Sequence, residues 1–409
     1  MKLTNQKIRK QLESLGINPA KVDALHLMMK SGELSHDSFV IEKSRLQAPT
    51  EKDYDKYHDL EKEKFQSIGT QSIKNDELLV FWLNGGAATR FYDESKIKSE
   101  EKSKYQKELD ALTPELIESP KGVTPVINDI SFLELKIINL LKLTKDLNLK
   151  NHPQVILMNS FITDEPTRKH LDGLFKKYPE LKPSRFHYVV QTHTIPRFNK
   201  VENLEDIDVF VDSKGNLSFA PCGHGDFLYL LQEYLRDENI PNVKYMFFSN
   251  IDNLGTFIDP IILGYHINSG KGRTVELVAK DPGDKGGAPC FVDDELIIVE
   301  QMKFPDNFNQ DQIKVFNTNN FWFTIFDLEN YDQELPLVIA EKIIPEGDVW
   351  QLEHFACDVN LPSTYLEVPR QERFWPTKRY VDLLLFKDSS SPEHKIIKQL
   401  FKKQYNLSI

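Results

Sequence analysis

The sequence predicts a three-layer α/β fold built on a mostly parallel, Rossmann-like sheet. From residue 77 onward, short apolar and β-branched runs alternate with segments of helical periodicity. Strands that alternate with helices pair in parallel and carry helices on both faces of the sheet. Ligands bind such sheets at the carboxyl ends of the strands, so the polar turns after the apolar runs are the places to search for a site.

Seven apolar runs are expected strands, and four segments between them are expected helices. The strands are expected at 77–83, 154–159, 185–191, 243–249, 274–279, 295–299 and 320–325. The helices are expected at 132–148, 164–177, 226–236 and 259–268. Thr163, followed by Asp164 and Glu165, is typical of a helix start, because acidic residues in a first turn interact favourably with the helix dipole.

We expect the chain to divide into three parts. Residues 1–75 are predicted to form an N-terminal helical segment, in which Thr4 caps a first helix and Asn18 caps a second. Residues 76–380 are predicted to form the main domain, interrupted by a charged insertion at 92–119. Residues 381–409 are predicted to form a short tail, whose amphipathic helix docks on the protein's own body.

Composition and charge restrict the functions that fit. The 409 residues are 40% hydrophobic and 28% charged, as in ordinary globular proteins, and their net charge is −11. A negative field argues against general binding to nucleic acid or to an anionic membrane. The three cysteines show no CxxC spacing, which fits a reducing compartment. The sequence has no apolar run near ~18 residues and no signal peptide, so we expect a cytoplasmic protein. No oligomeric state is predicted.

The first expected strand runs directly into Asn84-Gly85-Gly86, and Arg90 follows shortly after. Glycines let a backbone approach a ligand and offer its N–H groups, and an arginine can neutralise phosphate oxygens. Asn-Gly after an apolar run is also a strong signal for a hairpin turn. The motif therefore fits a nucleotide-binding loop and a hairpin equally well.

Further polar turns hold candidate ligand contacts. The Gly-His-Gly turn at 223–225 can bring backbone amides and an imidazole to one ligand. Asp252 follows the most apolar strand, where a lone carboxylate either binds Mg²⁺ or closes an Asx turn. Lys121 is a candidate phosphate contact, although a lysine there is more often plain surface charge. Lys378 lies between aromatic residues and an apolar run, so it is not expected to be plain surface charge. The Lys-Gly-Gly loop at 285–287 and the amide run at 317–320 suit sugar hydroxyls and are also ordinary loop compositions.

The order of these motifs resembles that of the UDP-glucose pyrophosphorylase family of uridylyltransferases. The matching stretches extend from residue 83 to residue 385. They are LNGGAATR (83–90), PKGVTPV (120–126), VILMNSFITDEPTRKHL (155–171), QTHTIPR (191–197), GHGD (223–226), FFSNIDNLG (247–255), KGG (285–287), FNTNNFW (316–322) and VPRQERFWPTKRYVDLLL (368–385). The resemblance implies that 76–380 is a nucleotidyltransferase domain.

The resemblance also implies roles for the matching residues. It assigns uridine to Leu83, Gly85 and Gly86, the uracil ring to Met158 and Gln191, and the ribose and phosphate to Gly223 and His224. It assigns the sugar to Asn250, Gly287, Glu300 and Asn319, and a Mg²⁺ cofactor to Asp252. Lys121, Lys378 and Arg90 are the implied catalytic residues, which neutralise the phosphates.

The implied reaction joins UTP and a sugar 1-phosphate, with glucose as the default sugar, to give a UDP-sugar and pyrophosphate. The sugar phosphate is already anionic when it attacks the α-phosphorus in line, so no strong general base is required. Positioning and charge neutralisation are what the protein must supply.

The sequence departs from the family pattern in its first loop. Ala88 stands where the family carries a glycine, and a φ above zero there would cost on the order of 1 kcal/mol. The insertion 92–119 separates this loop from Lys121. A non-catalytic UDP-sugar sensor is therefore one alternative, and it would bind UDP-sugar without pyrophosphate exchange. A glycosyltransferase is another, but such enzymes use Asp-x-Asp where this chain has Ile-Asp-Asn at 251–253.

Overall fold

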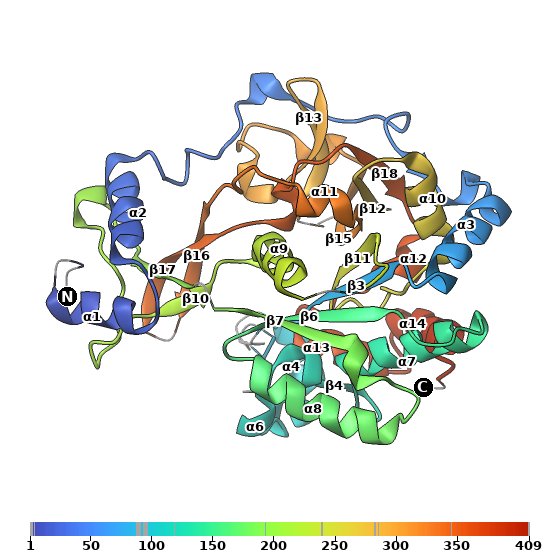
Figure 1. Cartoon of the computed structure of the whole chain (residues 1–409). Helices are drawn as coiled ribbons and strands as arrows, with labels where there is room; N and C mark the ends of the chain where they lie inside the picture. The colour runs from blue at the N-terminus through green and yellow to red at the C-terminus, as the bar shows by residue number, and fades with distance from the viewer. Residues whose placement is uncertain are drawn as a thin grey trace.

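The central element of the protein is an eight-stranded, mostly parallel sheet, seen in a computed structural model (Figure 1). The structure describes residues 3, 5–86, 91–92, 97–117, 119–192, 194–238, 240–281, 284, 286–344 and 346–407. The strands lie in the order β2 (Asp55–Lys56), β18 (Ser363–Glu367), β12 (Arg273–Ala279), β15 (Val315–Thr324), β11 (Tyr245–Asn250), β3 (Leu78–Leu83), β6 (Gln154–Ser160) and β7 (Phe186–Gln191).

Strand β15 runs antiparallel to both of its neighbours, and every other neighbouring pair in the sheet is parallel. Six of the seven expected strands belong to this sheet, which confirms the predicted fold class. The seventh, 295–299, forms β14 (Glu295–Val299) in a separate antiparallel sheet with β1 (Leu46–Gln47) and β13 (Ala288–Val292). Periodicity reports that a segment is a strand, but it carries no information about which sheet the strand joins.

Alternating residues of the central strands supply two cores, one on each face of the sheet. In β3, Val80 belongs to one core cluster and Phe81 to the other. Helices α3 (Lys62–Lys74), α7 (Phe132–Asp146), α8 (Asp164–Lys177) and α10 (Pro260–Ser269) contribute to the first cluster. Helices α9 (Phe227–Asp237) and α11 (Ile325–Glu329) contribute to the second. Both faces are thus covered, as a parallel sheet requires.

The four expected helices form at their predicted positions, as α7, α8, α9 and α10. In α8 the first residue is Asp164, and Asp164 and Glu165 occupy the first turn. Gly69 of α3 and Gly264 of α10 let these two helices approach closely. A Cβ on Gly69 would lie 1.9 Å from the carbonyl oxygen of Pro260, and one on Gly264 would lie 1.9 Å from that of Phe65.

Residues 1–75 contribute to several parts of the molecule. Helices α1 (Gln6–Ser14) and α2 (Pro19–Ser31) pack in a third core cluster over a small sheet of β9 (Phe198–Asn199), β16 (Val338–Ile344) and β17 (Gly347–Glu353) (Figure 1). Asn5, rather than Thr4, is the N-cap of α1, because its side chain accepts a hydrogen bond from Lys7 N; Thr4 lies outside the described residues. Asn18 caps α2, as predicted.

The insertion and the C-terminal tail lie together beside the first core. The insertion contains three short helices, α4 (Ser99–Lys104), α5 (Gln106–Asp110) and α6 (Pro114–Ile117). The tail contains α13 (Tyr380–Lys387) and α14 (Pro392–Tyr405), and α14 buries Ile397, Leu400 and Phe401 in the first core. The remaining elements are β4 (Pro125–Ile127), β5 (Ile130–Ser131), β8 (Thr194–Pro196), β10 (Phe219–Pro221) and α12 (Arg370–Arg373).

Within the described ranges, none of these helices combines the length and the apolar character needed to cross a membrane.

Candidate functional site

The carboxyl ends of four neighbouring strands meet at one edge of the central sheet. The strand register places Leu83 opposite both Met158 of β6 and Asn250 of β11, and it pairs Ser160 with Gln191 of β7. Three predicted site residues, Leu83, Met158 and Asn250, therefore lie side by side, and a fourth, Gln191, lies two residues further along β7. The turns that leave these strands carry further predicted site residues.

The turn after β3 is not a hairpin, because β3 pairs in parallel with both β6 and β11. The backbone N–H of Asn84 donates to the carbonyl of Met158 at 2.9 Å, which extends the pairing by one residue. A Cβ on Gly85 would lie 2.8 Å from Gln191 Oε1, so only glycine fits here without displacing that amide. The geometry favours the ligand loop of the two sequence interpretations.

Asn84 and Gly122 join this turn to the segment that follows the insertion. Asn84 is buried, and its Nδ2 donates to Asn159 Oδ1 at 2.7 Å and to Thr167 Oγ1 at 2.9 Å. A Cβ on Gly122 would lie 1.9 Å from Asn84 Oδ1. The backbone N–H of Lys121 donates to Gly86 O at 3.2 Å. The predicted phosphate lysine thus lies directly against the glycine turn, although the insertion 92–119 separates the two in the sequence.

Lys121 and Asp252 form a largely buried ion pair at this edge. Lys121 Nζ lies 2.5 Å from Asp252 Oδ2, and the two side chains are 13% and 21% exposed. Lys121 Nζ also lies 5.1 Å from the centre of the Phe91 ring. The backbone N–H of Thr377 donates to Asp252 O at 3.1 Å, which brings the turn with Lys378 to the same place.

The side chain of Lys378 is exposed to solvent. The sequence neighbours of Lys378 predict that it is held between aromatic residues, and the structure contradicts this prediction. Arg90, the third predicted catalytic residue, lies outside the described residues, as does Ala88. Lys121, Asp252 and the Lys378 turn are the predicted phosphate and metal groups that the structure brings together.

Gln191 is buried and its amide orientation is fixed. Its Nε2 donates to Gly223 O at 2.8 Å and to Asp226 Oδ2 at 3.0 Å, which leaves Oε1 beside Gly85. Burial raises the pKa of Asp226 to about 6. Gly223 has a φ of 84°, and a Cβ there would lie 2.6 Å from His354 O, so glycine is required on both counts.

His224 follows this glycine and is held by Ala356. The backbone N–H of Ala356 donates to His224 Nδ1 at 3.0 Å, which assigns the proton of a neutral imidazole to Nε2. Burial lowers the pKa of His224, so the neutral ring dominates at pH 7. Its Nε2–H is the group available to donate to a ligand.

The predicted sugar contacts form a second group around β15. Asn319 Nδ2 donates to Asn250 Oδ1 at 2.9 Å, and Asn319 adopts a left-handed φ of 60°. The Oδ1 atom of Asn319 is buried without a hydrogen-bond partner among the described residues, which is costly unless a ligand supplies a donor. A Cβ on Gly287 would lie 3.0 Å from Glu300 Oε1, so these two predicted residues are in contact.

A cavity of about 760 Å³ opens beside Glu300 and Gly286. His36, Asp37 and Val40 of the N-terminal segment line its other side. The N-terminal segment therefore reaches Glu300, one of the predicted sugar contacts.

The donor set fits a divalent ion that arrives with a substrate. Among the described residues, no three His, Cys, Asp or Glu side chains gather as a ready-made metal site. Mg²⁺ commonly uses one or two carboxylates and completes its shell with water and phosphate oxygens. Asp252 offers one such carboxylate at the edge where Lys121 would meet phosphate.

Comparisons with known proteins identify the family of the chain. The family model for UTP–glucose-1-phosphate uridylyltransferase matches residues 116–404. The chain belongs to this family. Among named relatives, a probable UTP–glucose-1-phosphate uridylyltransferase of Schizosaccharomyces pombe is 32% identical over 66% of this chain and 54% of its own length. A UTP–glucose-1-phosphate uridylyltransferase of Musa acuminata is 28% identical over 88% of this chain and 72% of its own.

Solved structures share the fold. A UDP-glucose phosphorylase of Trypanosoma brucei has a TM-score of 0.68 at 23% identity, over 93% of this chain and 78% of that one. A UDP-N-acetylglucosamine pyrophosphorylase of the same organism has a TM-score of 0.67 at 16% identity, over 88% and 75%. The chain thus spans about half of the S. pombe relative and about three quarters of these structures.

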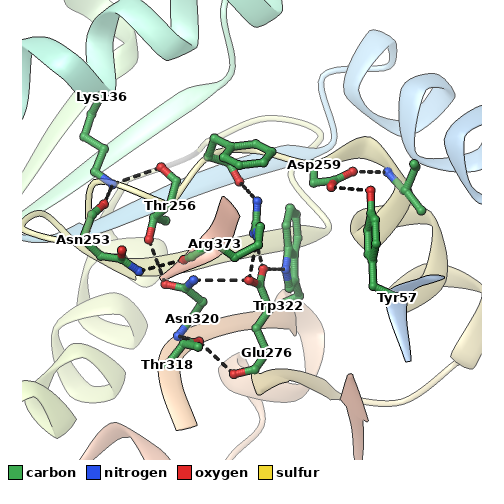
Figure 2. A network of polar contacts seen from close by, with 12 residues as sticks. Tyr57, Lys136, Asn253, Thr256, Asp259, Glu276, Thr318, Asn320, Trp322 and Arg373 are labelled. Atoms are coloured by element: carbon green, nitrogen blue, oxygen red, sulfur yellow. Dashed lines mark hydrogen bonds and ion pairs between the residues drawn. The ribbon is translucent and has the colours of Figure 1, made fainter. Parts of the chain in front are cut away.

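A buried polar network supports the site of this family member, and the sequence reasoning above missed it (Figure 2). Lys136 Nζ of α7 donates to the carbonyls of Asn253 at 2.7 Å and Thr256 at 3.1 Å, in the loop that carries Asp252. Arg373 of α12 pairs with Glu276 of β12, and both are almost fully buried.

Further contacts of the network tie β15 and the Lys378 turn to the Asp252 loop. Asn320 Nδ2 donates to Glu276 Oε2 at 3.2 Å, and its Oδ1 accepts from Thr256 Oγ1 at the same distance. Asn253 Oδ1 accepts from the backbone N–H of Trp375 at 2.7 Å. The sequence carries only a partial signal for the network, because Glu276 interrupts the apolar run of β12 but nothing nearby identifies its partner.

Proposed function

We propose that the chain transfers the uridylyl group of UTP to a sugar 1-phosphate, with glucose 1-phosphate as the first candidate. The observation that carries the proposal is the meeting of the Gly85-Gly86 turn, the Lys121–Asp252 pair and the Lys378 turn at one sheet edge. Backbone donors and cations suit the neutralisation of phosphate charge, and the carboxylate would hold a divalent ion that does the same. Family membership supports the same activity.

In the proposed reaction an oxygen of the sugar phosphate bonds to the α-phosphorus of UTP. The bond from that phosphorus to the β-phosphate bridging oxygen breaks, and pyrophosphate leaves with its electron pair. The role of the protein is to hold two anions in line and to offset the charge that gathers on the equatorial oxygens. Lys121 and Lys378 would supply that charge, and the N–H groups of the glycine turn would orient the nucleotide.

The two ends of the substrate would occupy the two groups of residues already described. Gln191 Oε1, fixed beside Gly85, would accept the uracil N3–H, as an amide oxygen can. The unpartnered Oδ1 of Asn319 would accept a sugar hydroxyl. His224 Nε2–H would donate to the ribose or to a phosphate.

A Mg²⁺ ion would be held by Asp252 together with phosphate oxygens, and it would neutralise charge on the transferring group. Lys121, which pairs with Asp252 Oδ2 in the structure, would contact phosphate oxygens when the substrate is bound. The pair would thus serve as a charge-balanced resting arrangement. The buried thiols of Cys222, Cys290 and Cys357 are not joined in disulfides, which supports a reducing, cytoplasmic compartment for this reaction.

The test is release of pyrophosphate from UTP and Mg²⁺ in the presence of glucose, galactose or N-acetylglucosamine 1-phosphate. Release with one sugar phosphate, and none with UTP alone, is expected. No release with any of the three, from protein that binds UDP-glucose in a calorimeter, would contradict the proposal and favour a UDP-sugar sensor. Omission of Mg²⁺ is expected to abolish release.

A further inference from the structure

The insertion between the first loop and Lys121 docks on the helix that follows Lys378. Tyr105 and Leu109 of the insertion are buried with Val381 and Leu384 of α13 in a core cluster of their own. The Tyr105 hydroxyl also donates to Asp388 Oδ2 at 3.0 Å, at the far end of α13. A segment that behaved as solvated surface would not bury aromatic and aliphatic side chains in this way.

Polar contacts join the insertion to the residue next to Lys378. Arg379 donates to both carboxylate oxygens of Glu101, at 2.9 Å and 3.2 Å. Arg379 also donates to Asp382 Oδ1, at 2.9 Å from its Nη2. These side chains are only 18% to 26% exposed. A bidentate pair between arginine and carboxylate fixes orientation as well as distance.

Asp382 in turn holds the backbone of the catalytic candidate. Its Oδ2 accepts from the backbone N–H of Lys378 at 3.0 Å and from that of Arg379 at 2.8 Å. On the other side of Lys378, Thr377 N–H donates to the carbonyl of Asp252. The chain of contacts runs from Glu101 through Arg379 and Asp382 to Lys378, whose exposed side chain has the freedom that four methylene groups allow.

We propose that the insertion is a positioning element of the active site, in which Glu101 acts through Arg379 and Asp382 to fix the turn that carries Lys378. The inference rests on the proposed uridylyl transfer, because it assumes that Lys378 contacts the phosphates. The inference gives the insertion a role in the reaction itself, beyond any contribution to the stability of the fold. Glu101, Arg379 and Asp382 are positioning residues and do not touch the substrate.

The test is a double-mutant cycle between Glu101→Gln and Lys378→Ala, measured by pyrophosphate release. Glu101→Gln alone should lower kcat on the order of tenfold, with the KM for UTP changed less than about twofold, because misplacement of a charge contact weakens the transition state. In the Lys378→Ala background the same change should have no further effect, since coupled residues are not additive. Additive losses would overturn the inference.

Tyr105→Phe is the matched control within the insertion. It removes the hydrogen bond to Asp388, keeps the packing and does not touch Arg379. We expect unchanged kcat from this variant. A loss of kcat equal to that of Glu101→Gln would mean that the insertion acts only through general stability, and it would overturn the inference.

A stability measurement and a substitute variant distinguish a misfolded protein from a wrong inference. Thermal unfolding of each variant shows whether Glu101→Gln is folded at the assay temperature. If it is not, Arg379→Lys, which keeps the charge and loses the bidentate geometry, takes its place in the cycle with the same expectation. An inactive wild-type protein would contradict the proposed function and this inference together, whereas an active one with additive losses would contradict this inference alone.

Discussion

Lys121 and Asp252 neutralise each other in the structure, and this pairing determines what the site can accept. An anion can displace the carboxylate only if it interacts more strongly with the Lys121 ammonium group than Asp252 does. A phosphate with several charged oxygens can form such an interaction. Asp252 would then be free to bind the proposed Mg²⁺. A single neutral ligand would gain from neither change, because leaving one charge of a partly buried pair unpaired is costly.

Lys378 provides the simplest prediction at this scale. Lys378→Ala should lower kcat by on the order of 10²-fold or more and leave the unfolding free energy nearly unchanged, because its side chain is exposed and its charge is needed only in the transition state. Steady-state kinetics and urea unfolding measure the two quantities. Lys395→Ala, in the first turn of α14, is the control and should change neither quantity. Normal turnover by Lys378→Ala would remove this residue from the mechanism.

Asp226 provides a prediction about pH. Its ordinary pKa is near 3.8 and burial raises it to about 6, so ionisation costs the folded state free energy. That cost is absent below about pH 4, grows as the pH rises to about 6 and then stays constant. A shift of about two units corresponds to roughly 3 kcal/mol.

Asp226→Asn lacks this cost. Its free energy of unfolding, relative to wild type, should therefore rise by up to about 3 kcal/mol between pH 4 and pH 7. Urea unfolding of both proteins at four pH values in that interval tests the prediction. A difference between the two that does not change with pH would contradict it.

At the scale of elements, the glycine pair between α3 and α10 joins the N-terminal segment to the body. Each glycine faces a backbone carbonyl of the other helix, so neither helix can move aside cheaply. α10 itself begins at Pro260 after Asp259, which caps the helix and accepts a hydrogen bond from Tyr57 of the N-terminal segment. Packing and capping thus fix the same contact.

Gly69→Ala should lower the unfolding free energy by about 3 kcal/mol, since a methyl group there would overlap Pro260 O and force the helices apart. Gly173→Ala is the matched control, because Gly173 lies exposed in α8 with nothing within 4 Å of its added Cβ. That change should raise stability by about 0.5–1 kcal/mol through helix propensity. Equal effects from both substitutions would show that the close approach is not what matters.

The elements also show what the sequence could and could not predict. The long apolar runs identified six strands of the central sheet, and helical periodicity identified four of the helices that flank it, because the burial of one face sets the spacing of apolar residues. The segment 363–367, which forms β18, and the pair β16–β17 were missed, since polar and charged residues break up their apolar runs. Pairing partners were beyond reach as well, and β14 was therefore placed in the wrong sheet.

Similar reasoning applies to the site. Glycine turns and the order of motifs identified residues that the structure brings together, such as Gly85 with Gln191 and Lys121 with Asp252. The Lys121–Asp252 contact spans 131 residues, and no local pattern reports it. The network around Glu276 and Arg373 was missed for the same reason, because a buried charge is recognised only once its partner is known.

At the scale of the whole molecule, two cores enclose the central sheet and a third lies apart from it. The third core joins α1, α2 and the small sheet of β9, β16 and β17. The edges of this sheet are poorly protected, because the edge strand β9 has only two residues and Ile343 of β16 is 82% exposed. Stability is therefore expected to be unequal across the molecule.

Amide hydrogen exchange should reveal this inequality. Amides of β3, β11 and β15 should exchange only on global unfolding, because these strands have neighbours on both sides and cores on both faces. Amides of β9, β16 and β17 should exchange faster, by at least about tenfold, through local opening. Mass spectrometry of peptides from the two sheets is the measurement. Equal protection would mean that the third core unfolds cooperatively with the other two.

The central claim is that the sheet edge at β3 and β11 carries out a reversible transfer at the α-phosphorus. The most direct test is ³¹P nuclear magnetic resonance of UDP-glucose, pyrophosphate and Mg²⁺ incubated with the protein. The account predicts the appearance of UTP and glucose 1-phosphate in equal amounts, with Lys378→Ala slower by on the order of 10²-fold. An unchanged spectrum from folded wild-type protein would contradict it.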